Sequence, residues 1–206
     1  MKKKGLILVL AVILLLASVG TGTLAWLTAK SDTVTNTFTT SDISIVLEET
    51  KGTGTGNNKE FKMIPGCEIE KDPKVWVETG SEDCYLFVKV DVAGNTCGTG
   101  ESVVNFLNYT IDSGWTQLVD ENKANVNGVY YRKVTSQEMG TGHKFSVLSG
   151  DKVTVSGNVT KEMMKAIETK TIANPTITIT AYASQLHSTN NVEFEPIAAW
   201  RNLPTA

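Results

Sequence analysis

The chain has 206 residues, of which 20% are charged and 41% hydrophobic, and its formal net charge is −3. This composition is typical of a globular protein and excludes disorder over the whole length. The acidic excess argues against a nucleic-acid partner, because a phosphate-binding surface needs clustered Lys and Arg side chains.

The first 25 residues have the pattern of a secretory signal peptide. Three lysines follow the initial methionine, residues 5–16 are almost entirely apolar, and Thr23 and Ala25 are small residues at the −3 and −1 positions. We therefore predict export, with cleavage between Ala25 and Trp26 by a signal peptidase.

Removal of residues 1–25 leaves 16 basic against 22 acidic residues, a net charge of −6 that suits a soluble exported protein. The alternative is an uncleaved membrane anchor, because no charge occurs between Lys4 and Lys30. The strongly apolar part is short for a membrane span, which favours cleavage.

Residues 26–40 are predicted to form an extended segment ahead of the folded domain. Within it Val34, Asn36 and Phe38 alternate with Thr33 and other threonines. Thr and Val favour extended backbone because branching at Cβ restricts χ1. A free strand carries unpaired N–H and C=O groups that need a partner. The segment is therefore a candidate polymerisation strand, donated by one copy of the chain to the next.

Residues 41–206 are predicted to form a single β domain. Residues 43–48 alternate as a half-buried strand, and residues 51–59 are a Gly- and Asn-rich surface loop. Val75 and Val77 share one strand face, with Trp76 on the other. Residues 84–92 are the clearest strand and are predicted to be central in a sheet.

The second half of the chain predicts further strands and short helices. We expect a short helix over residues 101–107, a hairpin turn at Asn127 and Gly128, and a hairpin-like pair of strands at residues 145–148 and 153–155. Thr160 is a plausible N-cap for a helix over residues 161–170. A long strand at 176–185 and a short amphipathic end at 196–203 complete the pattern.

Many short strands separated by Gly, Pro and Asn indicate a mainly β fold, an antiparallel β-sandwich with two or three short helices. Hydrophobic periodicity alone does not separate a jelly-roll sandwich from an immunoglobulin-like one.

The sequence contains no recognisable catalytic, metal or cofactor motif. It has two histidines, His143 and His187, and no H-E-x-x-H pattern, and we expect both to be surface residues. The three cysteines, Cys67, Cys84 and Cys97, show no C-x-x-C spacing. They allow one disulfide or three free thiols, and the position of Cys84 on an apolar strand face favours a core residue.

The front of the chain resembles the amino-terminal signature of the TasA–camelysin family. That resemblance extends in order through further blocks and covers about half of the chain. The matching residues are Gly22, Thr23, Ala25, Trp26, Ser31, Asp32, Asn36, Phe38 and Thr39, followed by residues 63–66, 71–73, 82–90 and 177–185.

The resemblance implies a jelly-roll-like, exported protein of a Gram-positive bacterium, processed by a dedicated type I signal peptidase. It also implies a subunit of an extracellular biofilm-matrix or cell-surface filament whose partner is another copy of itself. Two alternatives remain, a camelysin-like metalloendopeptidase and a monomeric accessory or anchor module. The missing metal motif argues against the peptidase, so we expect a protein that is not an enzyme.

Overall fold

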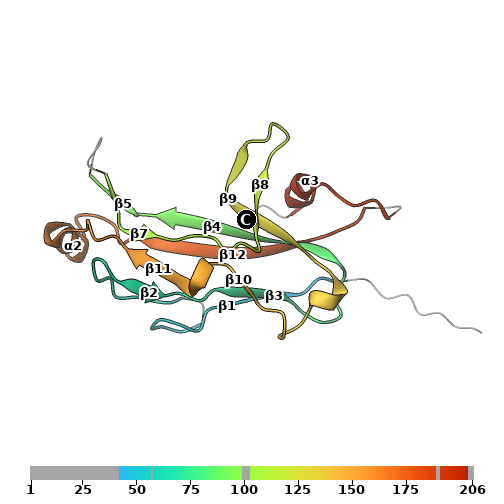
Figure 1. Cartoon of the computed structure of the whole chain (residues 1–206), viewed down its shortest axis with the longest axis horizontal. Coiled ribbons are helices and arrows are strands. Elements are labelled where there is room, and N and C mark those ends of the chain that lie inside the picture. Colours follow the sequence, from blue (N-terminus) through green and yellow to red (C-terminus); the bar gives the residue numbers. More distant parts are fainter. Residues whose placement is uncertain (1–41, 57, 99–102, 189–190, 204–206) are drawn as a thin grey trace, which may run out of the picture. The chain divides into compact units, whose positions relative to one another are not determined.

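The computed structural model describes residues 42–56, 58–98, 103–188 and 191–203, and Thr40–Ala206 form one compact unit. This unit is mainly β and antiparallel (Figure 1), which confirms the predicted fold class. The strands are β1 (Ile45–Glu48), β2 (Glu68–Glu70), β3 (Lys74–Val77), β4 (Cys84–Ala93), β5 (Thr96–Cys97), β6 (Val104–Asn105), β7 (Leu107–Asn108), β8 (Thr116–Val119), β9 (Asn125–Val134), β10 (Phe145–Ser146), β11 (Lys152–Val155) and β12 (Thr176–Gln185). The helices are α2 (Lys161–Glu168) and α3 (Pro196–Arg201), with 3-10 turns at Ser136–Glu138 and Ser149–Asp151.

The largest sheet has the strand order β12-β4-β9-β8, and all of its neighbouring strands are antiparallel. Strand β4 lies inside this sheet, as predicted, and its residues 84–88 are all buried. Both faces of β4 are therefore covered, which explains why its sequence is apolar at consecutive positions and not only at alternate ones.

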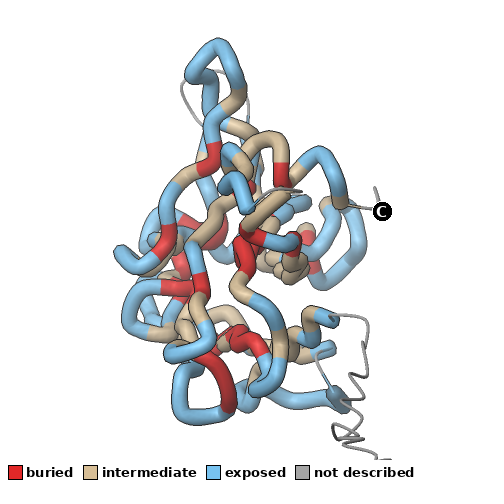
Figure 2. Tube along the Cα trace, turned by 90° about the vertical axis from the view of Figure 1, so that its right-hand side faces the viewer, coloured by how far each residue is buried: buried red, intermediate tan, exposed pale blue. Residues whose placement is uncertain are grey.

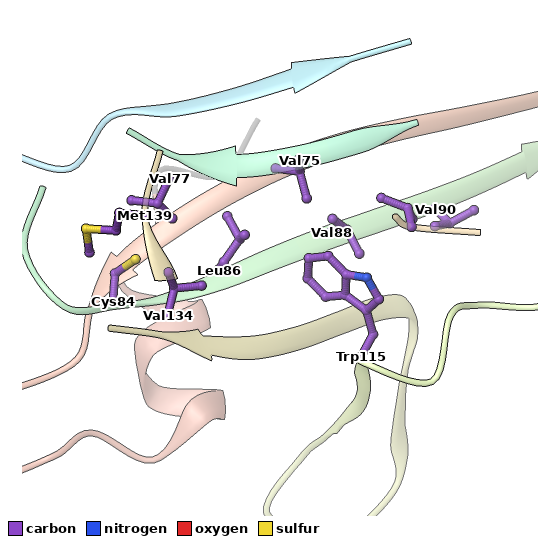
Figure 3. Close-up of a cluster of buried hydrophobic side chains, with 10 residues drawn as sticks. Val75, Val77, Cys84, Leu86, Val88, Val90, Trp115, Val134 and Met139 are labelled. Atoms are coloured by element: carbon purple, nitrogen blue, oxygen red, sulfur yellow. The ribbon is translucent and has the colours of Figure 1, made fainter. Parts of the chain in front are cut away.

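Two three-stranded sheets, β1-β3-β10 and β2-β11-β7, form the second layer. Val75 and Val77 of β3 belong to the same core cluster as Leu86 and Val88 of β4, and their side chains point toward one another (Figure 3). The arrangement is that of a β-sandwich. The finer assignment to a jelly roll stays a prediction.

Helix α3 covers the other face of the four-stranded sheet. The ring of Trp200 lies 5.3 Å, between centroids, from both Phe87 of β4 and Tyr182 of β12. This confirms the short amphipathic element predicted at residues 196–203. Buried stretches lie in the interior and exposed stretches at the periphery of the domain (Figure 2).

The helix predicted at residues 101–107 is wrong over the described residues from 103 onward. Strands β6 and β7 occupy this segment. The Asn95 side chain accepts a hydrogen bond from the N–H of Leu107 at 2.7 Å and donates one to its carbonyl at 2.9 Å. Asn95 therefore holds Leu107 extended, and the helical spacing of the valines there is coincidental.

The turn predicted at Asn127 and Gly128 is also misplaced. These residues lie within β9, and the chain reverses at residues 120–124, where the Asp120 carboxylate accepts hydrogen bonds from two backbone N–H groups at 2.8 and 2.9 Å. Gly128 has φ +69°, and a Cβ there would meet the Val90 carbonyl oxygen at 2.4 Å. Glycine is needed at this position for close approach of two strands, not for a hairpin turn.

The hairpin-like pair predicted at residues 145–148 and 153–155 is wrong as well. Strand β10 pairs with β3, whereas β11 pairs with β2 and β7, so the two strands belong to different sheets. The connection between them, with Gly150 at φ +67°, carries the chain from one sheet to the other. Trp76 of β3 is buried like its neighbours Val75 and Val77, and the Lys144 ammonium lies 4.2 Å from the centre of its ring.

Candidate functional site

A groove of about 890 Å³ opens beside the first half of β12. We call it the β12 groove. Its other walls are the end of β1, the chain at residues 58–63, strand β2 and helix α2. Its apolar lining comes from the strand residues Leu47, Ile69, Leu107, Val153, Ile177 and Ile179, with Phe61, Met63, Pro73, Met164, Ile167 and Pro175 from other segments.

The apolar lining of the β12 groove belongs to one of the hydrophobic clusters of the domain. Leu107 and Val153 are buried, whereas Ile69, Ile177 and Ile179 are only half-buried. Contacts with further apolar side chains would remove more of the isoleucine surface from water, and this burial is favourable. The groove can therefore accept apolar side chains from an added segment.

Strand β12 forms the edge of its sheet along this groove. Every residue of Thr176–Gln185 pairs with β4, and among the described residues no second strand pairs with β12. In a sheet edge, backbone N–H and C=O groups point away from the neighbouring strand and can pair with an added strand. Edge and apolar lining together make the β12 groove fit an extended peptide.

Helix α2 forms one flank of the groove and is positioned by its N-cap. The Thr160 hydroxyl accepts a hydrogen bond from the N–H of Met163 at 3.3 Å, which is the N-cap predicted from the sequence. Met163, Met164 and Ile167 pack on the cluster, as predicted, and Met164 and Ile167 also line the groove. Methionine adapts its shape readily, which suits a wall that must fit an incoming side chain.

The lining also contains polar and charged side chains, most of them exposed, namely Asn58, Lys59, Glu60, Lys170, Asn174, Thr176 and Thr178. One ion pair in the lining is buried. The Lys71 ammonium lies 2.9 Å from both carboxylate oxygens of Glu49, and both side chains line the groove. The side chains are only 11% and 8% exposed, respectively. The same ammonium lies 5.2 Å from the centre of the Phe61 ring. We call Lys71 and Glu49 the groove ion pair.

Asp72 anchors the chain where it leaves the groove wall. Its carboxylate accepts hydrogen bonds from the Thr50 hydroxyl at 2.5 Å, the Thr50 N–H at 3.0 Å and the Lys51 N–H at 2.8 Å. Burial acts to raise the pKa of Asp72, but these hydrogen bonds stabilise the charged form and the net effect is a pKa below the ordinary value. The predicted surface loop at residues 51–59 begins here and is mostly exposed.

The predicted signal cleavage residues Ala25 and Trp26 lie outside the described residues. The predicted polymerisation strand, with Thr33, Val34, Asn36 and Phe38, also lies outside them. Their roles stay predictions.

The three cysteines are described, and all three are free thiols. Cys67 is exposed, Cys97 is half-buried, and Cys84 is buried in the core, as its strand position suggested. Burial, together with the charge of Asp83, raises the pKa of the Cys84 thiol to about 12. This thiol is therefore protonated and unreactive at neutral pH.

The two histidines lie in separate segments. His143 is exposed after the turn at Gly140, and His187 is half-buried where it bridges to Glu193. Within the described residues, no three His, Cys, Asp or Glu side chains come close enough to hold a metal ion. None of the helices in the same part of the chain has the length and apolar character needed to cross a membrane.

Sequence reasoning did not predict the β12 groove, because its lining comes from positions scattered between residues 47 and 179. One signal was present in the sequence: β12 reads TITITAYASQ and carries no charge, which is unusual for a strand at a sheet edge. Comparisons of the chain with protein-family models, with curated proteins and with solved structures return no match.

Proposed function

We propose that this protein is a secreted structural protein, the subunit of an extracellular filament of a Gram-positive bacterium. In this proposal a signal peptidase removes residues 1–25, and residues 33–38 of one copy then add as a strand to β12 of the next. The observation that carries the proposal is the β12 groove, a groove of about 890 Å³ with apolar and polar lining beside an uncharged edge strand.

Residues 33–38 are the proposed occupant of the β12 groove because their alternating side chains complement its lining. Strand addition uses main-chain hydrogen bonds for affinity and alternate side chains for fit. Residues 33–38 alternate between threonines and a second set, Val34, Asn36 and Phe38. Val34 and Phe38 would cover the half-buried isoleucines of the groove, and the threonines would face solvent. A donor strand at one end of each copy and a groove in the next give a head-to-tail contact that does not close, which produces a fibre.

The similarity to the TasA–camelysin family in sequence blocks supports the same role. Its members are exported filament subunits, and we propose that this chain assembles and is processed in the same way, on the cell surface or in a biofilm matrix. The proposal assigns it a structural role and no catalytic one. A minor anchor or accessory subunit is a further partner that the same strand addition would allow.

The proposal is tested by removing the donor strand. The mature chain, beginning at Trp26, should form filaments visible by electron microscopy and should shift to larger species in size-exclusion chromatography as its concentration rises. A chain beginning at Ser41 should stay monomeric over the same range. Equal polymerisation of the two chains would overturn the strand-addition mechanism, and a mature chain that stays monomeric would favour the accessory module.

A matched pair of substitutions on α2 tests the groove itself. Met164→Glu places a charge in the groove lining and should block assembly, whereas Met163→Glu changes a neighbouring half-buried methionine that does not line the groove. The second variant should assemble nearly as well as the parent. Equal loss in both variants would indicate a general effect on the fold.

A further inference from the structure

The groove ion pair places two buried charges in the β12 groove, and binding of apolar side chains alone would not need them. Burying two charges has a desolvation penalty that their attraction does not always recover, and apolar residues of similar size are often as stable. The best-attested use of such buried polar groups is to fix register or partner choice. The position of Lys71 and Glu49 in the groove lining suggests that use.

The groove ion pair has hydrogen-bonding capacity left for a ligand. An ammonium has three N–H donors, and Lys71 directs bonds to both oxygens of Glu49. A carboxylate accepts about four hydrogen bonds, and within the described residues the Glu49 carboxylate accepts from Lys71 alone. An incoming group that both donates and accepts hydrogen bonds would therefore satisfy the pair.

The proposed donor strand carries such a group between two apolar residues. Along an extended strand, Val34, Asn36 and Phe38 fall on one face at intervals of about 7 Å. The Asn36 amide can donate to Glu49 and accept from Lys71. This order offers one polar group between two apolar ones to a groove whose lining combines apolar side chains with one buried ion pair.

We infer that the groove ion pair of Lys71 and Glu49 binds Asn36 of the neighbouring copy and so fixes the register of the added strand. This inference rests on the proposed function. A slip by one residue turns the threonines into the groove. A slip by two residues places Val34 or Phe38 against the charges, which then lose water without gaining a hydrogen bond.

The same chain's own Asn36 is a poorer partner. Asn36 precedes Asp42 by six positions, so the two residues are at most about 20 Å apart when the chain is fully extended. Glu49 follows Asp42 by seven positions, and because this stretch is mostly extended the two residues are about 24 Å apart. The chain would also have to reverse direction within the shorter stretch, so a second copy is the favoured source of the Asn36 amide.

The test is a double-mutant cycle on the mature chain, measured as the monomer concentration that remains in equilibrium with polymer. Asn36→Leu should raise this concentration about 10- to 100-fold, because the charges stay buried and unsatisfied. The double variant Glu49→Leu with Lys71→Met should also raise the monomer concentration, because the Asn36 amide then faces an apolar wall without a hydrogen-bond partner. Combining all three substitutions should restore much of the loss.

Thr35→Leu is the matched control, because it makes a similar change on the opposite face of the strand and should show no such coupling. Thermal melts of the groove variants confirm that they are folded. Unchanged assembly of Asn36→Leu, or strictly additive effects, would overturn the register inference and leave the filament proposal standing. A parent chain that never polymerises overturns both.

Discussion

Strands β2 and β12 both end a sheet, but their surroundings differ in charge. On β2, Glu68 lies 2.6 Å from the Lys152 ammonium and Glu70 lies 2.9 Å from that of Lys51, and all four side chains are about half exposed or more. Strand β12 carries no charge. Both strands line the β12 groove, β2 through Ile69 and β12 through its first residues. Charges on an edge strand discourage pairing with another chain. The contrast is consistent with the proposal that β12 accepts a partner strand, whereas charges protect the edge at β2.

The groove ion pair and the ion pairs on β2 differ in burial, and this difference gives the largest expected effect on stability. Lys71→Met leaves the Glu49 carboxylate buried without its partner and should lower the free energy of unfolding by about 3–5 kcal/mol. Urea denaturation of the monomeric chain beginning at Ser41 measures this. The double variant Glu49→Leu with Lys71→Met should recover most of the loss, and failure to recover would show that the pair itself supplies net stability.

A smaller effect is expected at Asp72, which holds the groove wall through hydrogen bonds. Asp72→Ala removes a buried acceptor from three donors and should lower the free energy of unfolding by about 1–3 kcal/mol at pH 7.

Asp72 also makes the free energy of unfolding depend on pH. Because the pKa of Asp72 is lower in the folded chain than in the unfolded one, its contribution is full above the ordinary Asp pKa and disappears as pH falls through the lower folded value. The difference in unfolding free energy between parent and Asp72→Ala should therefore shrink below about pH 4. A difference that stayed constant from pH 7 to pH 3 would contradict the assignment.

The smallest effect is expected at the exposed edge. Lys152→Met removes the partner of Glu68 and should change the free energy of unfolding by less than about 1 kcal/mol, because exposed ion pairs are weak and screened by salt. This variant is also the control for Lys71→Met, since both changes are Lys to Met. Comparable losses in the two variants would remove the distinction between the edges.

The elements that could be predicted from the sequence are those whose signals are local. The central strand β4 and the helix α2 follow from periodicity and from the Thr160 cap. The errors arose where a distant partner decides the structure. Leu107 is extended because the side chain of Asn95 holds it, and β10 and β11 separate because their partners lie in different sheets.

One part of the candidate site could be predicted from the sequence and the other could not. The proposed donor strand is a local pattern of alternating residues that the sequence displays directly. The β12 groove is assembled from residues as far apart as Leu47, Leu107 and Ile179, so no spacing rule could have brought them together. The groove ion pair joins positions 49 and 71 through a contact that only the folded domain creates.

The pairing of β4 with β12 joins Cys84 to Gln185, and thus the middle of the chain to its last long strand. Such distant pairing makes folding slow, since the intervening loop must close before the contact forms. The largest sheet therefore cannot be completed while the second half of the chain is still being synthesised. Late folding suits the proposed export, because a chain that has not yet folded can be translocated in an unfolded form.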